Sequence, residues 1–312
     1  MAEPVISARG LRRSYDGVEA VRGIDLGVDR GEVFAFLGPN GAGKTTTVEI
    51  LEGYRRRDAG TVSVLGTDPL QAGRDWRQRI GIVLQECRMQ PRLTVRETVE
   101  LYAGYYERPR SVAETIDLVG LAGKADERAA RLSGGQQRRL DVALALIGDA
   151  ELLFLDEPTT GFDPSARRQA WDVIASLRSL GKTVFLTTHY MDEAQALADR
   201  VAIIAGGEIV AEGTPETLAG RDLAPTEVRF RLPESATLAD LPEAVAAAID
   251  AGSGAGNGAP AGLVVVRTGD PLRVLNELTA WALAREVELP GLEVTRPSLE
   301  DVYLEVTERR AS

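Results

Sequence analysis

The chain has 312 residues, enough for one large domain and a small one, and its 44% hydrophobic and 27% charged residues are typical of a globular protein. Its net charge of -11 argues against a nucleic-acid binder with a broad basic surface, so we expect no nucleic-acid partner. The single cysteine, Cys87, excludes an internal disulfide framework. Because no apolar run approaches about 18 residues and no basic, apolar leader precedes the first strand, we expect neither a membrane span nor a secretory signal.

The first elements in chain order are two predicted strands, at residues 5–9 and 24–28, with Tyr15 in a turn between them. An apolar run at 33–37 then predicts a buried strand, and residues 47–53 predict a helix closed by a glycine. The loop between this strand and this helix matches G-x-x-x-x-G-K-[ST] in the strand–loop–helix context that the motif requires. A glycine-rich turn that matches by chance is the alternative, and this context argues against it.

This loop has the chemistry of a phosphate-binding site. Its backbone N–H groups can turn inward around an anion, and the start of the following helix adds partial positive charge. Lys44 can reach the β- and γ-phosphates of a nucleotide, and the Thr45 hydroxyl can ligate Mg²⁺. The residues that we expect to surround the phosphates are Gly38, Pro39, Asn40, Gly41, Ala42, Gly43, Lys44, Thr45 and Thr46.

The next part of the chain changes from strands to helices. Residues 61–65 and 80–84 predict two more strands, whereas Thr94 and Ser111 each open a capping box that starts an amphipathic helix. Residues 88–148 are therefore predicted to be a mostly helical insertion within an α/β domain.

Two further motifs specify the site. The sequence LSGGQ at residues 132–136 stands at a helix start, where Ser133 and the following glycine amides can bind a second anion. The apolar strand at 152–155 ends in Asp156 and Glu157, whose side chains point opposite ways, so that one can address Mg²⁺ and the other the attacking water. His189, the sole histidine, follows the next strand at 183–187.

The remaining elements complete a mainly parallel sheet and a small accessory domain. Asp163 and a proline start a helix that runs to Gly181, and strands at 201–205 and 208–211 form a hairpin. The domains predicted are 1–220, a nucleotide-binding α/β domain, and 221–312, a small α+β domain. The elements expected in the second domain are strands at 227–232, 263–267 and 292–296, helices at 238–250 and 271–284, a loop at 251–262 and a last helix from Ser298.

These motifs, in this order, resemble the ATP-binding subunits of ABC transporters, over roughly residues 3–220. The tail RPSLEDVYL at 296–304 is similar to the C-terminal domain of the daunorubicin-resistance subgroup of drug exporters. The resemblance implies a P-loop NTPase fold and a Mg²⁺-dependent ATPase that works as a dimer. It also implies a separate membrane permease, which would hold the chain at the cytoplasmic face of the cell membrane.

The resemblance also implies roles for individual residues. It makes Glu157 the general base, His189 the residue that contacts the γ-phosphate, and Gln85 a residue that links Mg²⁺ and water to the permease-facing surface. It makes Tyr15 the aromatic residue that stacks on adenine. The residues that it assigns to the nucleotide of the opposite protomer or to the dimer contact are Ser133, Gly134, Gly135, Gln136 and Asp163. Phe162 departs from the small residues that many such proteins carry before this aspartate, which affects the expected dimer packing.

Two other functions compete with an exporter ATPase. A non-transport ATPase of the same family, acting in DNA repair or translation, would carry long coiled-coil insertions or two cassettes, and this chain shows neither. A binding module with an inactive site would lack part of the set Lys44, Asp156, Glu157 and His189, all of which are present. Tyr15 and Gln85 carry the least independent signal, since a tyrosine in a turn is often a packing residue.

Overall fold

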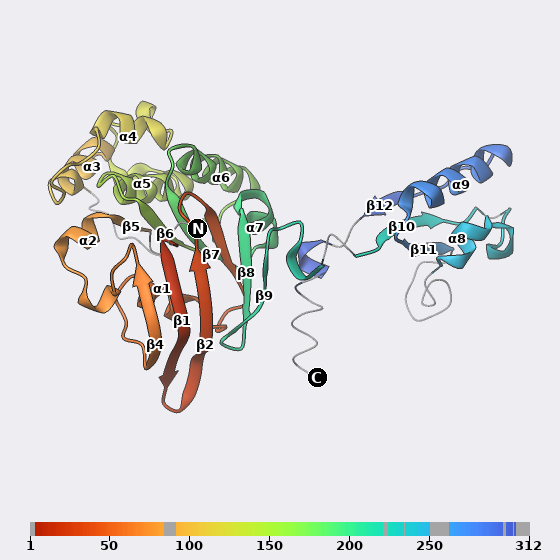
Figure 1. Ribbon diagram of the computed structural model, residues 1–312. Helices are drawn as coiled ribbons and strands as arrows, with labels where there is room; N and C mark the ends of the chain where they lie inside the picture. Colours follow the sequence, from red (N-terminus) through yellow and green to blue (C-terminus); the bar gives the residue numbers. More distant parts are fainter. Residues whose placement is uncertain are drawn as a thin grey trace. The chain divides into compact units, whose positions relative to one another are not determined.

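The computed structural model describes residues 4–83, 92–220, 224–233, 235–249, 262–295, 298–301 and 303. The chain divides into two compact units, of which the first ends at Pro215 and the second begins at Glu216 (Figure 1). Gln85 and Cys87 lie outside the described residues, as does most of the glycine-rich loop expected at 251–262.

A six-stranded sheet forms the centre of the first unit. Five of its strands are parallel, and the last, β9, is antiparallel to β8 because a tight hairpin joins the two. This arrangement confirms the predicted α/β fold with a mainly parallel sheet. From edge to edge the strands are β5 (Ile80–Val83), β6 (Leu152–Asp156), β7 (Thr183–Thr188), β3 (Val33–Leu37), β8 (Arg200–Ala205) and β9 (Glu208–Gly213).

A second, antiparallel sheet packs against the first and closes the core. Its order is β2 (Val18–Val28), β1 (Ile6–Tyr15) and β4 (Ala59–Val64). The first two strands are about twice as long as the sequence indicated, and Tyr15 is the last residue of β1 rather than part of a turn. The pairing Tyr15↔Val18 across the Asp16–Gly17 turn explains the difference: polar residues continue the strands beyond the apolar stretches that the pattern detected.

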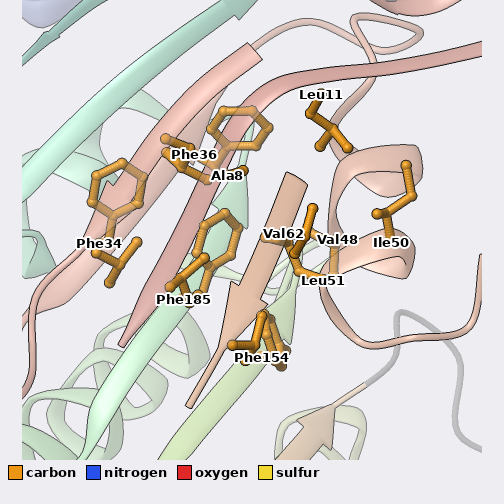
Figure 2. Packing of buried hydrophobic residues seen from close by; sticks show 14 of the residues in the cluster. Ala8, Leu11, Phe34, Phe36, Val48, Ile50, Leu51, Val62, Phe154 and Phe185 are labelled. Atoms are coloured by element: carbon orange, nitrogen blue, oxygen red, sulfur yellow. The ribbon is translucent and has the colours of Figure 1, made fainter. Parts of the chain in front are cut away.

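Aromatic side chains fill the space between the sheets. Four fully buried phenylalanines come from three adjacent parallel strands: Phe34, Phe36, Phe154 and Phe185. The ring centroids of the first three lie 5.6–5.8 Å from that of Phe185. Figure 2 shows them beside Leu51 and its neighbours on the helix that follows β3. Each such ring buries about 150–250 Å². Backbone pairing places the carboxyl ends of β3, β6 and β7 side by side.

Helices cover the sheets. Helix α1 contacts β2 and β4 of the antiparallel sheet and β6 of the parallel sheet, whereas α6 and α7 contact β7 on the parallel sheet. Asp163 caps α6 by accepting from the N–H groups of Ser165 and Ala166, both at 2.9 Å, as the Asp-Pro pair predicted. The bounds are α1 (Lys44–Leu51), α2 (Arg74–Gln78), α6 (Pro164–Ser179) and α7 (Met191–Leu197), with a short 3₁₀ turn at Pro69–Gln71. Another 3₁₀ turn, at Leu218–Gly220, falls in the second unit.

The predicted helical insertion is present between β5 and β6 and starts, among the described residues, at Arg92. Thr94 and Glu97 form the expected capping box, and the Ser111 hydroxyl caps the next helix by accepting from the Glu114 N–H. Figure 1 shows its helices gathered at one end of the six-stranded sheet. They are α3 (Val95–Ala103), α4 (Val112–Leu118) and α5 (Gly134–Leu146), with 3₁₀ turns at Ala122–Lys124 and Ala129–Arg131.

The second unit is a small α+β domain with its own core. Val228, Phe230, Val264 and Val266 pack on apolar residues of the two helices. The helix expected at 238–250 is much shorter, because Pro242 divides it into a 3₁₀ turn (Leu238–Asp240) and a five-residue helix. The other elements are β10 (Thr226–Arg231), α8 (Glu243–Ala247), β11 (Leu263–Thr268), α9 (Pro271–Ala284) and β12 (Glu293–Thr295), in the strand order β11–β10–β12.

Candidate functional site

The glycine-rich loop lies between β3 and α1, so the start of α1 opens toward whatever the loop holds. Lys44 is the first residue of α1 and only 5% of it is exposed. Its ammonium group donates to the carbonyl oxygens of Gly38 at 2.7 Å and Pro39 at 3.2 Å, which folds the side chain back across its own loop. Burial lowers the pKa of Lys44, and the neighbouring Glu157 and Asp156 carboxylates oppose that effect.

The tightness of this loop yields a prediction about Gly43. Its φ of +106° disfavours any side chain, and a Cβ there would come within 2.4 Å of the Ala20 carbonyl oxygen. Gly43→Ala should therefore lose more than about 2 kcal/mol of stability, since backbone strain alone costs about 1–3 kcal/mol. Gly41→Ala is the matched control, because its φ is +80° but a Cβ there meets nothing within 4 Å. Equal thermal unfolding of both variants would contradict this account of the loop.

The loop forms one wall of a cleft of ≈ 690 Å³. The opposite wall comes from the ends of β6 and β7, so residues more than a hundred positions apart face one another. A second hollow of similar size, ≈ 700 Å³, lies beside Glu52 and Tyr102, and the described residues that line it include no predicted site residue. Those that line the first cleft are Tyr15, Ala20, Asn40, Gly41, Gly43, Lys44, Thr45, Thr46, Glu157, Thr160 and His189.

Glu157 joins the two walls of this cleft. Its Oε1 lies 3.5 Å from the Lys44 ammonium, and its Oε2 lies 3.3 Å from Nδ1 of His189 and accepts a 3.0 Å hydrogen bond from the Thr160 hydroxyl. Burial raises the pKa of the Glu157 carboxyl, but the Thr160 hydrogen bond and the neighbouring Lys44 and His189 outweigh burial, and the pKa falls below its ordinary value. The group is therefore an ionised carboxylate at neutral pH, as a base that attracts a proton from water must be.

Asp156 and Glu157 point to different partners, as adjacent residues at a strand end should. The Thr187 hydroxyl, directly across the β6–β7 pairing, donates to Asp156 Oδ1, and it also accepts from the Glu157 backbone N–H at 3.0 Å. Glu157 has a φ of +46°, an uncommon conformation that turns its side chain out of the strand direction and over the cleft. Thr187 thus fixes the backbone of one carboxylate and the side chain of the other.

The motif at 132–136 lies apart from this cleft within the single chain. Ser133 caps α5 and forms a capping box with Gln136, and Ser133 and Gly134 are exposed. Of the described residues, those lining the cleft do not include Ser133, Gly134, Gly135, Gln136 or Asp163. The exposed helix start is therefore available to another surface. For Gln85 the structure offers no placement, because that residue lies outside the described part of the chain.

Sequence reasoning passed over three side chains that shape the site. Thr160 holds Glu157, Thr187 holds Asp156, and the buried guanidinium of Arg138 donates to the backbone carbonyls of Pro158 at 3.1 Å and Asp156 at 2.8 Å. The positions of the two threonines, at or just after the ends of β7 and β6, could have indicated them, because the carboxyl ends of neighbouring parallel strands meet at one edge of a sheet. Nothing in the sequence pattern pairs Arg138 with those carbonyls, because the contact depends on how α5 packs.

A buried acid close to the site gives a prediction about pH. Burial raises the pKa of Glu52 to about 8 from its ordinary 4.5, and the charges of Asp156 and Glu49 add to the shift. The folded chain therefore binds this proton more tightly than the unfolded chain does, so stability is lost as pH rises from about 4.5 to about 8. Glu52→Gln removes the titrating group. It should match the original chain at pH 5 and exceed its stability at pH 8 by at least about 2 kcal/mol, since one pKa unit is worth about 1.4 kcal/mol. Denaturant unfolding at both pH values measures this, and a difference that does not change with pH would contradict it.

Comparison with known families fits these observations. The model for the ABC transporter family matches residues 21–160, which include the phosphate loop and both carboxylates. A second model, the C-terminal domain of ABC transporter domain-containing protein-like chains, matches residues 226–298 in the second unit. No helix in the described part of the chain is long and apolar enough to cross a membrane.

Individual relatives and solved structures agree with the family models. The daunorubicin/doxorubicin resistance ATP-binding protein DrrA of Streptomyces peucetius is 38% identical over 97% of this chain and 92% of its own length. The Nod factor export ATP-binding protein I of Burkholderia orbicola is 40% identical over 77% of this chain and 81% of its own. An ATP-binding cassette solved as a post-hydrolysis dimer with ADP and Pi has a TM-score of 0.60 and 25% identity, covering 67% of this chain and 98% of that one. These relatives support the exporter function and not the DNA-repair or translation alternative. The chain therefore belongs to the ABC transporter family, as the ATP-hydrolysing subunit of an exporter.

Proposed function

We propose that the cleft between the glycine-rich loop and the ends of β6 and β7 is where this subunit binds and hydrolyses ATP. In this proposal the loop amides and Lys44 hold the β- and γ-phosphates, and Tyr15 stacks on adenine at the other end of the cleft. Glu157 orients and deprotonates the attacking water, and His189 contacts the γ-phosphate. The observation that carries the proposal is that one carboxylate, Glu157, touches both Lys44 and His189 in the same cleft.

The charges of the site suit phosphoryl transfer to water. Hydrolysis of this kind leaves the protein little covalent chemistry to do, so positioning and charge stabilisation supply most of the acceleration. The Lys44 ammonium lies 3.5 Å from Glu157 Oε1 and partly neutralises its charge. When a triphosphate takes over the lysine, that carboxylate loses a partner, and its affinity for a proton from water rises.

The residues near the loop also fit Mg²⁺. Asp156 offers a carboxylate with one oxygen held by Thr187, and Thr45 offers an exposed hydroxyl on the cleft wall. Mg²⁺ prefers such oxygen ligands and usually takes only one or two carboxylates beside the phosphates. Bound Mg²⁺ would neutralise charge on the β- and γ-phosphate oxygens. We propose Asp156, Thr45 and Gln85 as its ligands.

We further propose that two subunits close over ATP. The Ser133 end of α5 is exposed, and the start of a helix carries partial positive charge that favours an anion. Aimed at the γ-phosphate in a second subunit, it would stabilise charge that one loop leaves partly uncovered. Gly134, Gly135, Gln136 and Asp163 belong to the same proposed contact.

A cysteine crosslink tests this closure. Asn40→Cys and Ser133→Cys are combined in one chain with Cys87→Ser. Both positions are exposed in the single chain. A disulfide between chains should form only when ATP is present, because the proposed closure over ATP brings Ser133 of one chain to the phosphate loop of the other. Adding Glu157→Gln to slow hydrolysis should increase the yield. Neither single-cysteine variant should give the product in the same amount. A product that forms equally without nucleotide, or never forms, would overturn the proposed dimer.

The transport partner follows from the relatives. We propose that the subunit docks on a separate membrane permease at the cytoplasmic face, and that the permease carries a drug-like or lipid-like molecule out of the cell. Support comes from relatives named for daunorubicin/doxorubicin resistance and for Nod factor export. We also propose residues 1–220 as the nucleotide-binding domain and 221–312 as an accessory domain.

A further inference from the structure

Glu193 is a buried acid to which no role has been assigned. It lies on α7, four residues after His189, and is 0% exposed. A carboxylate is almost never fully buried unless its surroundings satisfy it, because leaving water costs several kcal/mol.

Its hydrogen bonds reach two other parts of the site. The Thr159 hydroxyl donates to Glu193 Oε1 at 2.8 Å, and the indole N–H of Trp171 on α6 donates to the same oxygen at 3.3 Å. Burial raises the pKa of Glu193, and the hydroxyl of Thr188, at the end of β7, counters this as Thr159 does. Thr159 is itself 0% exposed, so its bond to Oε1 is shielded from water. The other oxygen, Oε2, is buried and has no hydrogen-bond partner among the described residues.

Glu193 and its partner Thr159 are close in sequence to the groups that hold Glu157. Thr159 precedes Thr160, whose hydroxyl donates to Glu157 Oε2 at 3.0 Å. Glu193 lies four residues after His189, whose Nδ1 lies 3.3 Å from the same oxygen. The 2.8 Å bond from Thr159 to Glu193 therefore joins the segment of Thr160 to the segment of His189.

We propose that Glu193 is a positioning residue that sets the place of the Glu157 carboxylate. It ties together, below the cleft, the two segments from which Thr160 and His189 reach that carboxylate. The paired part of β6 and β7 ends at Asp156 and Thr187, and beyond that pair the two segments lead into different helices. This inference rests on the proposed role of Glu157 in hydrolysis.

A carboxylate suits this purpose better than an apolar side chain of similar size. Apolar packing is non-directional, whereas an acceptor bound by several donors from different segments fixes their relative place. A second link between the same helices lies at the surface, where Arg167 on α6 donates to Asp192 on α7 at 3.1 Å. The Asp192 side chain is 56% exposed. An exposed pair of this kind contributes little, so it provides a matched control one residue away.

Kinetics separate positioning from binding. Glu193→Ala should lower kcat for ATP hydrolysis at least about tenfold while KM changes less than about twofold, because a displaced base mainly affects the transition state. Thr159→Val removes the same contact from the other side and should act in the same direction. Glu193→Gln should keep kcat within about threefold, since its amide oxygen can still accept from Thr159 and Trp171. Asp192→Asn should behave like the original chain.

The sole histidine allows a readout that does not depend on turnover. His189 gives the one histidine imidazole signal in the spectrum of the full chain labelled at histidine. Glu193→Ala should shift this signal in the nucleotide-free protein, because the segment that carries His189 is released, whereas Asp192→Asn should leave it in place. If Glu193→Ala does not fold, as judged by thermal unfolding, Thr159→Val provides both the kinetic and the spectroscopic tests.

The outcomes separate this inference from the proposed function. If Glu157→Gln abolishes hydrolysis but Glu193→Ala and Thr159→Val retain the original kcat, the positioning role is wrong and the site stands. An unchanged histidine signal in both of these variants, or a rise in KM that matches the fall in kcat, also overturns it. If Glu157→Gln itself keeps full turnover, the proposed site fails, and this inference fails with it.

Discussion

Replacing Glu157 with glutamine should nearly abolish ATP hydrolysis while leaving ATP binding almost unchanged. The carboxylate is ionised and sits where the two walls of the cleft meet, so its loss removes the group that takes a proton from water. A general base contributes about 10²–10⁴-fold to a rate, and turnover should fall by that much. Glutamine has nearly the same shape, so it keeps the packing of the cleft while it removes the charge. Steady-state phosphate release and equilibrium nucleotide binding measure the two effects.

Glu151 provides a matched control for this change, because it immediately precedes the first residue of β6, whereas Glu157 follows the last. Its carboxylate pairs with Arg79 at 2.6 Å and with Arg30 at 2.8 Å, and the Arg79 hydrogen bond lowers its pKa to about 2. Glu151→Gln should cost some stability at the protein surface and leave turnover unchanged. Full hydrolysis by Glu157→Gln would show that another group positions the water.

Lys44→Ala should remove tight ATP binding, and turnover with it. The lysine is the buried cation of the loop, and truncating one partner of a buried, hydrogen-bonded charge pair costs about 2–5 kcal/mol. We therefore expect the dissociation constant for ATP to rise roughly 30-fold or more. Isothermal titration of the purified subunit measures it directly.

The matched control for this variant is Lys182→Ala. Lys182 is also buried, at 9% exposure, but its ammonium binds Asp149 at 2.8 Å, and it is not among the residues lining the cleft. This change should lower stability without altering ATP affinity. If Lys44→Ala bound ATP as tightly as the original chain, the loop could not be the phosphate site.

Local chemistry made the centre of the fold predictable. The run at 33–37 is buried at every position, as expected of a strand whose two faces are both covered in a parallel sheet. Capping residues such as Thr94, Ser133 and Asp163 start their helices where the sequence indicated, because the hydrogen bonds they make reach only two or three residues along the chain. Where the pattern was weak, the predictions failed: β1 and β2 extend through polar residues, and Pro242 shortens a helix that the alanines around it favour.

The sequence by itself determined which residue types take part in this protein's site. Three local patterns indicate the site: a phosphate loop, two carboxylates after an apolar strand, and a histidine after the next strand. Each pattern occupies only a few adjacent residues. Only the tertiary structure decided that Lys44, His189 and Thr160 converge on one carboxylate, and that Thr187, Arg138 and Glu193 hold the segments around it. The physical reason is that, apart from the Thr160–Glu157 bond, which spans three residues, these contacts join segments from about twenty to more than a hundred residues apart. Their geometry depends on strand order and on the packing of α5, α6 and α7, which no local pattern contains.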